Sequence, residues 1–146
     1  MKSDQALWND LIERAREARS RAYAPYSGYA VGAAILDAEG RVWTGCNVEN
    51  ASYGLSLCAE RVAVARMVAA GSREIAALAV ATRDGAPPCG LCLQTLIEFA
   101  PADASSLGVA LAADEGHPRV FSLSDLLPHA FRTSRLRRTE AEGRSV

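Results

Sequence analysis

Residues 58–82 read C-A-E-R-V-A-V-A-R-M-V-A-A-G-S-R-E-I-A-A-L-A-V-A-T. The Ala-, Val- and Arg-rich part, Cys58–Ala70, predicts a helix, and Gly71 is the residue type that most often ends one. The apolar run Ile75–Thr82 then has the length of a buried strand. A helix that passes through a glycine into a buried strand is a typical unit of a sheet covered by helices.

Further elements are indicated on both sides of this unit. After the loop 83–88, a helix is predicted over Cys89–Ala100, ending before Pro101. A capped helix from Ser3 to Tyr23 opens the chain. The remaining predictions are hairpin strands over Ala30–Leu36 and Arg41–Cys46 with a turn at Gly40, later strands over Leu107–Ala113 and Arg119–Leu123, and a capped turn over Ser124–Pro128. Strands joined through helices predict an α/β fold, a mixed five-stranded sheet with helices on both faces.

The composition excludes several classes of protein. Hydrophobic residues make up 49% and charged residues 23% of the 146 residues, which argues against a disordered or fibrous chain. No apolar run reaches the roughly 20 residues that span a bilayer, and the first residues lack the apolar stretch of a secretory signal. We therefore expect a cytoplasmic protein. The net charge of −1 indicates neither a nucleic acid nor a membrane as partner.

The charge is unevenly distributed along the chain. Residues 1–131 carry a net charge of −4, whereas residues 132–146 carry +3. Short charged chain ends are most often solvated and poorly ordered. We expect one folded domain over residues 1–131 and a poorly ordered, Arg-rich tail over residues 132–146.

Three of the four cysteines stand where a helix is predicted to begin. Cys58 opens one helix, and Pro88-Cys89-Gly90-Leu91-Cys92 opens another. Free N–H groups at a helix N-terminus favour a thiolate over a thiol. Three thiolates suit Zn²⁺ and leave its fourth position to water, which is typical of a catalytic zinc site.

Glu60 stands two residues after Cys58, in the first turn of the predicted helix. From there a carboxylate can reach a zinc-bound water without binding the metal, and can relay protons to a substrate. Two other interpretations apply to the cysteines. The pair Cys89 and Cys92 alone would suit a redox motif, and all four cysteines with Cys46 would suit a closed structural zinc site. The redox interpretation leaves Cys58 and Glu60 unexplained. The closed site is disfavoured because the spacing from Cys46 to Cys58 makes no zinc knuckle and Cys46 ends an apolar strand, where a buried free cysteine is ordinary.

At these residues the sequence resembles the zinc-dependent cytidine deaminases, in their small, nucleoside-acting and homotetrameric form. The motif C-A-E-R at 58–61 with P-C-x-x-C at 88–92 carries the resemblance, and a non-ligand glutamate with P-C-x-x-C is the known signature of the zinc deaminases. The segments 26–34, 45–54 and 126–131 extend it over roughly residues 5–131. The resemblance implies hydrolytic deamination of cytidine and deoxycytidine in pyrimidine salvage, with one Zn²⁺ per chain.

The resemblance also implies a role for each matching residue. Glu60 would be the proton shuttle and Arg61 would offset the negative charge of the thiolates. The zinc ligands would be Cys58, Cys89 and Cys92, and the substrate-binding residues would be Tyr29 against the pyrimidine, Asn47 and Glu49 at the sugar hydroxyls, Ala59, and Ala51, Tyr53 and Phe131 from neighbouring subunits. Asn47 and Glu49 face the same side if their loop is extended, although the ordinary role of such a pair is loop capping.

Two positions depart from the family pattern. Leu93 stands where the family usually has arginine, which removes one cation from a negative metal site. Tyr29 stands where phenylalanine is usual, and its hydroxyl needs a hydrogen-bond partner or water. Both changes leave open a second substrate class, a modified cytosine nucleoside. From another class of function, a non-catalytic zinc or thiol protein remains the alternative.

Overall fold

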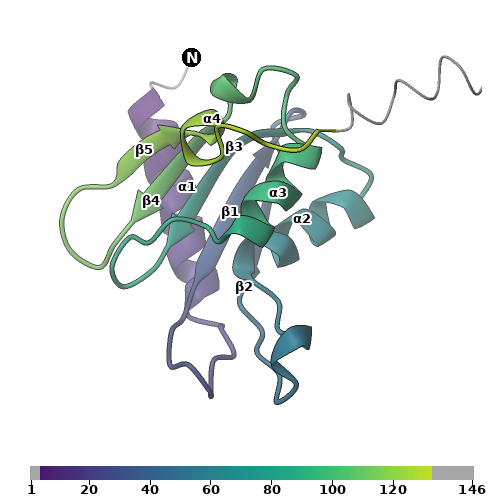
Figure 1. Cartoon of the computed structure of the whole chain (residues 1–146). Helices are drawn as coiled ribbons and strands as arrows, with labels where there is room; N and C mark the ends of the chain where they lie inside the picture. Colours follow the sequence, from purple (N-terminus) through teal and green to yellow (C-terminus); the bar gives the residue numbers. More distant parts are fainter. Residues whose placement is uncertain (1–3, 133–146) are drawn as a thin grey trace, which may run out of the picture.

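The computed structural model describes residues 4–132, which form one sheet between layers of helices (Figure 1). The elements are α1 (Asp4–Arg19), β1 (Gly32–Asp37), β2 (Val42–Cys46), the short 3₁₀ helix η1 (Tyr53–Leu55), α2 (Ala59–Ala69), β3 (Ile75–Ala81), α3 (Gly90–Glu98), the 3₁₀ helix η2 (Ala104–Ser106), β4 (Gly108–Ala112), β5 (Arg119–Ser122) and α4 (Leu123–Leu126). Within this described part, no helix is both long and apolar enough to cross a membrane.

The sheet has five strands in the order β2-β1-β3-β4-β5. The pair β3–β4 is parallel and the other three pairs are antiparallel, so the sheet is mixed. Helix α1 covers one face, and α2 and α3 cover the other (Figure 1). The predicted fold class, a mixed five-stranded sheet with helices on both faces, is confirmed.

The two faces of the sheet bury different kinds of side chain. Large residues such as Ile35 and Leu78 face α2 and α3 and form the larger core cluster. Alanines such as Ala34 and Ala79 face α1, where Leu11 fills the space between them. Side chains alternate between faces along a strand, so neighbouring positions in β1 and β3 supply both clusters.

Helix α2 lies unusually close to the edge strand β2. A Cβ built on Gly45 would stand 2.4 Å from the carbonyl oxygen of Ala59 and 2.6 Å from the amide nitrogen of Ala63. Only a residue without a side chain permits this approach. Gly45 therefore fixes where the first turn of α2 lies over the sheet.

Several of the predicted boundaries differ from the structure. The first helix ends at Arg19 and not at Tyr23, because Tyr23 pairs its backbone with Asn47 and Glu49. The second and third helices begin one residue later than predicted, so that Cys58 and Cys89 are N-cap residues. The last capped turn, α4, also begins earlier than predicted. Ser122 caps it in a reciprocal capping box with Asp125.

Two predictions fall on residues that the structure does not describe. Ser3, the expected cap of the first helix, lies outside the described range. So does the Arg-rich tail, apart from Arg132, whose guanidinium donates to the carbonyl oxygen of Pro101 at 3.0 Å.

Candidate active site

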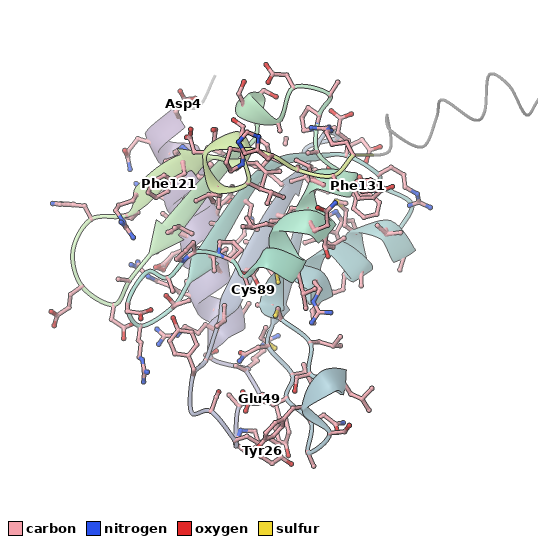
Figure 2. All side chains as sticks on the ribbon, in the orientation of Figure 1. Asp4, Tyr26, Glu49, Cys89, Phe121 and Phe131 are labelled. Carbon is pink, nitrogen blue, oxygen red and sulfur yellow. The ribbon has the colours of Figure 1, made fainter. Side chains whose placement is uncertain are left out.

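The beginnings of α2 and α3 bring three thiols together. The Sγ atoms of Cys58, Cys89 and Cys92 all lie within 4.8 Å of one another, with 3.9 Å between Cys58 and Cys89 and 3.5 Å between Cys89 and Cys92. Figure 2 shows Cys89 at the start of α3, with sulfur atoms gathered beneath it. Because Cys58 and Cys89 are N-caps, their side chains stand at the positive ends of the two helices.

The donor set fits Zn²⁺. Zinc–sulfur bonds of about 2.3 Å at tetrahedral angles place two sulfur ligands about 3.8 Å apart, close to the separations found here. All three thiols are free, and Cys46 is not part of the cluster. The structure therefore favours a three-thiolate site with an open position over a closed site of four cysteines.

The carboxylate of Glu60 lies beside this cluster and is buried. It retains only 4% of its accessible surface, and Oε2 is 3.6 Å from the Sγ of Cys92. Burial raises the pKa of Glu60, and the nearby negative charge of Cys58 adds to the effect. The side chain therefore holds its proton more readily than an exposed glutamate does.

The pKa values of two of the thiols, Cys58 and Cys92, are shifted in opposite directions. The pKa of Cys58 is lowered to about 5, chiefly by a hydrogen bond from Cys92 and also by the hydrogen bond and charge of Arg61. The same contact with Cys58, together with burial, raises the pKa of Cys92. Of these two thiols, Cys58 is the one that Arg61 stabilises as a thiolate.

Arg61 is the cation that faces the cluster from α2. One of its terminal nitrogens lies 3.9 Å from the Sγ of Cys58 and donates to the carbonyl oxygen of Ser56 at 3.1 Å. Its Nε is buried without a hydrogen-bond partner among the described residues. Leu93, which stands where the family usually has an arginine, supplies no second cation. Its side chain is buried in the core cluster between the sheet and α3. The charge of the site therefore depends on Arg61.

A cavity of about 300 Å³ opens above the cluster. Its lining includes the three cysteines with Ala59 and Glu60, and also Tyr29, Asn47 and Glu49. Sequence reasoning did not single out the rest of the lining: Ser27, Val31, Ser56, Leu57, Val80, Thr82, Ala86 and Pro87. Thr82 is the polar last residue of the predicted strand, where the loop that leads to Cys89 begins, and this position was the available signal.

Asn47 and Glu49 take part in the loops that form the cavity. The Asn47 amide donates to the carbonyl oxygen of Tyr29 at 2.7 Å and accepts from the N–H of Val31 at 2.8 Å. The Glu49 carboxylate accepts hydrogen bonds from the N–H groups of Tyr26 and Ser27 and from the Ser27 hydroxyl. Chiefly the Ser27 hydroxyl lowers the pKa of Glu49, so this carboxylate is held as an anion.

Residues 6–106 match the family model described as the cytidine and deoxycytidylate deaminase zinc-binding region. The chain belongs to this family. The cytidine deaminase of Halalkalibacterium halodurans is 46% identical over 123 residues, which are 83% of this chain and 91% of that protein. The cytidine deaminase of Mycobacterium tuberculosis is 47% identical over 127 residues, 85% of this chain and 89% of that protein.

Solved structures of the deaminase family share the fold. The 1.6 Å crystal structure of cytidine deaminase from Burkholderia pseudomallei superposes with a TM-score of 0.78 at 49% identity, over 84% of this chain and 98% of that one. The crystal structure of cytidine deaminase from Mycobacterium tuberculosis gives a TM-score of 0.72 at 45% identity, over 85% and 96%.

Three residues expected in a deaminase pocket do not line the cavity of this chain. Tyr53 borders an adjoining hollow, which shares Ser27, Glu49 and Ser56 with the cavity, and Ala51 is exposed on the same loop as Tyr53. Phe131 stands apart from Cys89 and Glu49 (Figure 2), and its carbonyl oxygen accepts a hydrogen bond from Gln94 at 2.8 Å. The cavity of a single chain is therefore formed without Ala51, Tyr53 and Phe131.

Proposed function

We propose that the protein catalyses the zinc-dependent hydrolytic deamination of cytidine and deoxycytidine to uridine and deoxyuridine, in pyrimidine salvage in the cytoplasm. The observation that carries this is the convergence of three thiols and the buried Glu60 in the lining of one cavity. Membership of the deaminase family supports the same reaction. A redox pair or a closed structural site has no use for a buried carboxylate at this place.

One Zn²⁺ per chain, held by Cys58, Cys89 and Cys92, would supply a Lewis acid that makes water easy to deprotonate. Glu60 then moves protons. Its carboxylate accepts a proton from the water that attacks C4 of the cytosine ring and passes this proton to N3. It next carries the second proton of the water to the amino group, which leaves as ammonia. The burial of Glu60 excludes bulk water from this transfer.

The rest of the cavity suits a nucleoside better than a nucleotide. Asn47 and Glu49 offer an amide and a carboxylate, which pair with sugar hydroxyls, whereas a carboxylate repels phosphate. The ring of Tyr29 lies on the cavity wall, where it can pack against a pyrimidine. We therefore place the sugar at Asn47 and Glu49 and the base between Tyr29 and Glu60.

We further propose a homotetramer in which Ala51, Tyr53 and Phe131 complete the pockets of neighbouring chains. Two of these three are large apolar side chains that are mostly exposed in the single chain, Tyr53 at 75% and Phe131 at 55%. Leu55, two residues after Tyr53, and Leu91, in the first turn of α3, are also exposed, at 66% and 69%. Exposed apolar side chains of this size are typical of surfaces that a partner covers.

The test is ammonia release by the zinc-loaded protein from cytidine, deoxycytidine, cytosine and CMP, with N4- and C5-modified nucleosides as further arms. We expect turnover of the two unmodified nucleosides. Glu60→Gln should lower kcat at least about 100-fold, the usual contribution of a proton shuttle, while one zinc per chain remains bound. Glu98→Gln, an exposed substitution on α3, serves as the matched control. Wild-type turnover by Glu60→Gln would contradict the proton-shuttle role.

A further inference from the structure

The hydroxyl of Tyr29 is bound outside the reaction centre. It donates a hydrogen bond to Oδ1 of Asp84, in the loop that joins β3 to α3. Burial raises the pKa of Tyr29, and the hydrogen bond to Asp84 raises it further, so the hydroxyl keeps its proton. The same bond is the main cause that lowers the pKa of Asp84, which is therefore the charged acceptor.

Asp84 is itself fixed by the loop that carries it. Its Oδ1 accepts from the hydroxyl of Thr82 and from the N–H of Ala86, both at 3.3 Å. The buried Thr82 hydroxyl in turn accepts from the N–H groups of Gly85 at 2.7 Å and Ala86 at 3.1 Å. Ala86 and Thr82 both line the cavity, and the same loop continues into Cys89. Asp84 therefore has a defined position relative to the metal-binding end of the cavity.

The backbone of Tyr29 is held by Asn47 and, through Ser27, by Glu49. We assign Asn47 and Glu49 to the sugar. Its carbonyl oxygen accepts from Asn47 at 2.7 Å. Its N–H donates to the Ser27 hydroxyl at 3.0 Å, and that hydroxyl donates to Glu49. One chain of hydrogen bonds thus runs from Glu49 through Tyr29 to Asp84, across the cavity wall.

A cation completes the arrangement. The guanidinium of Arg83 lies 4.9 Å from the centre of the Tyr29 ring, a distance typical of a cation–π contact. The ring therefore has one preferred orientation, set by Arg83 at its face and Asp84 at its hydroxyl. Phenylalanine, the residue usual in the family at this position, has no group for Asp84 to hold.

We propose that Asp84 is a positioning residue of the pyrimidine pocket, which fixes the Tyr29 ring against the cavity by binding its hydroxyl. This inference rests on the proposed function, because it assumes that the ring packs against the base. Asp84 acts through Tyr29 and does not touch the reacting atoms. Its loss should therefore weaken substrate binding and leave the chemical step largely intact.

The experiment compares Asp84→Ala in two backgrounds, the wild type and Tyr29→Phe. In the wild type we expect Asp84→Ala to raise KM for cytidine about tenfold, the usual effect of losing one hydrogen bond to a charged group, with kcat changed less than about twofold. In the Tyr29→Phe background, the same substitution should change KM less than about twofold, because no hydroxyl remains to be held. Glu115→Ala, an exposed carboxylate on the neighbouring β4–β5 loop, is the control.

An equal rise of KM in both backgrounds, or no rise in the wild type, would overturn the inference. The ultraviolet titration of the Tyr29 hydroxyl, taken as the difference from Tyr29→Phe, supplies a readout that needs no activity. Asp84→Ala should lower the pKa of that hydroxyl, and an unchanged pKa would refute the hydrogen bond. If the wild-type protein does not deaminate cytidine while this pKa does fall, the proposed function fails and the contact between Tyr29 and Asp84 stands.

Discussion

Replacing Gly45 with alanine should damage catalysis from a position outside the cavity. Gly45 lies in β2, and the added Cβ would meet the backbone of α2 at 2.4 Å from the Ala59 oxygen. Ordinary contacts of a Cβ begin near 3.4 Å. Backbone atoms cannot swing aside as the end of a side chain can. The helix start must therefore move, or the strand must bend.

The shift needed is about 1 Å, and misplacement of that size costs on the order of 100-fold in rate when it reaches catalytic groups. It would reach the proposed zinc ligand Cys58 and the proposed proton shuttle Glu60, because Ala59 stands between them in the chain. The crowding itself should destabilise the fold by about 1 to 3 kcal/mol. We therefore expect Gly45→Ala to lower kcat far more than its loss of stability explains, and to weaken zinc binding.

The assay measures kcat, zinc content and the free energy of unfolding well below the melting temperature. Gly108→Ala is the control, because its Cβ would come too close to the ring end of Trp8, at 2.7 Å, and would make an ordinary contact with Val120 at 3.8 Å. That ring can pivot, so Gly108→Ala should lose stability and keep kcat. If Gly45→Ala keeps wild-type kcat and zinc content, the position of α2 does not depend on the close approach to β2.

Two further predictions concern stability and assembly. Buried Asp37 accepts hydrogen bonds from Trp43 at 2.8 Å and from Arg41, which outweigh burial and lower its pKa to about 2. Asp37→Asn should therefore lower the free energy of unfolding by about 2 kcal/mol at neutral pH. A carboxyl group whose pKa is lowered by folding stabilises the fold above about pH 4, and this stabilisation is lost as the pH falls through about 2. The difference in free energy of unfolding between Asp37→Asn and the wild type, measured by denaturant titration, should therefore shrink over that range. Light scattering should give the mass of four chains, and a stable, active monomer would contradict the shared pockets.

The sheet and the metal site were predictable because their signals are local. Helix composition, a terminal glycine and apolar runs fix the order of elements, and two motifs at helix starts predict where the thiols meet. The contact between Tyr29 and Asp84 was not predictable in this way. It joins two loops far apart in the sequence, and neither residue has a pattern that indicates the other. The end of α1 was missed for the same reason, since Tyr23 is drawn into pairing with residues 47–49.

Loop capping and substrate binding need not exclude each other at Asn47 and Glu49. The internal bonds of Asn47 use one of its two amide hydrogens, and Glu49 is held as an anion by donors on one side. Both side chains are therefore oriented before any substrate arrives, with bonding capacity left for hydroxyl groups. Groups fixed in advance lose less freedom on binding, so the same hydrogen bonds that shape the loops would favour the sugar recognition that we propose. Loop capping by Asn47 and Glu49 is thus the physical basis of their proposed role in binding the sugar.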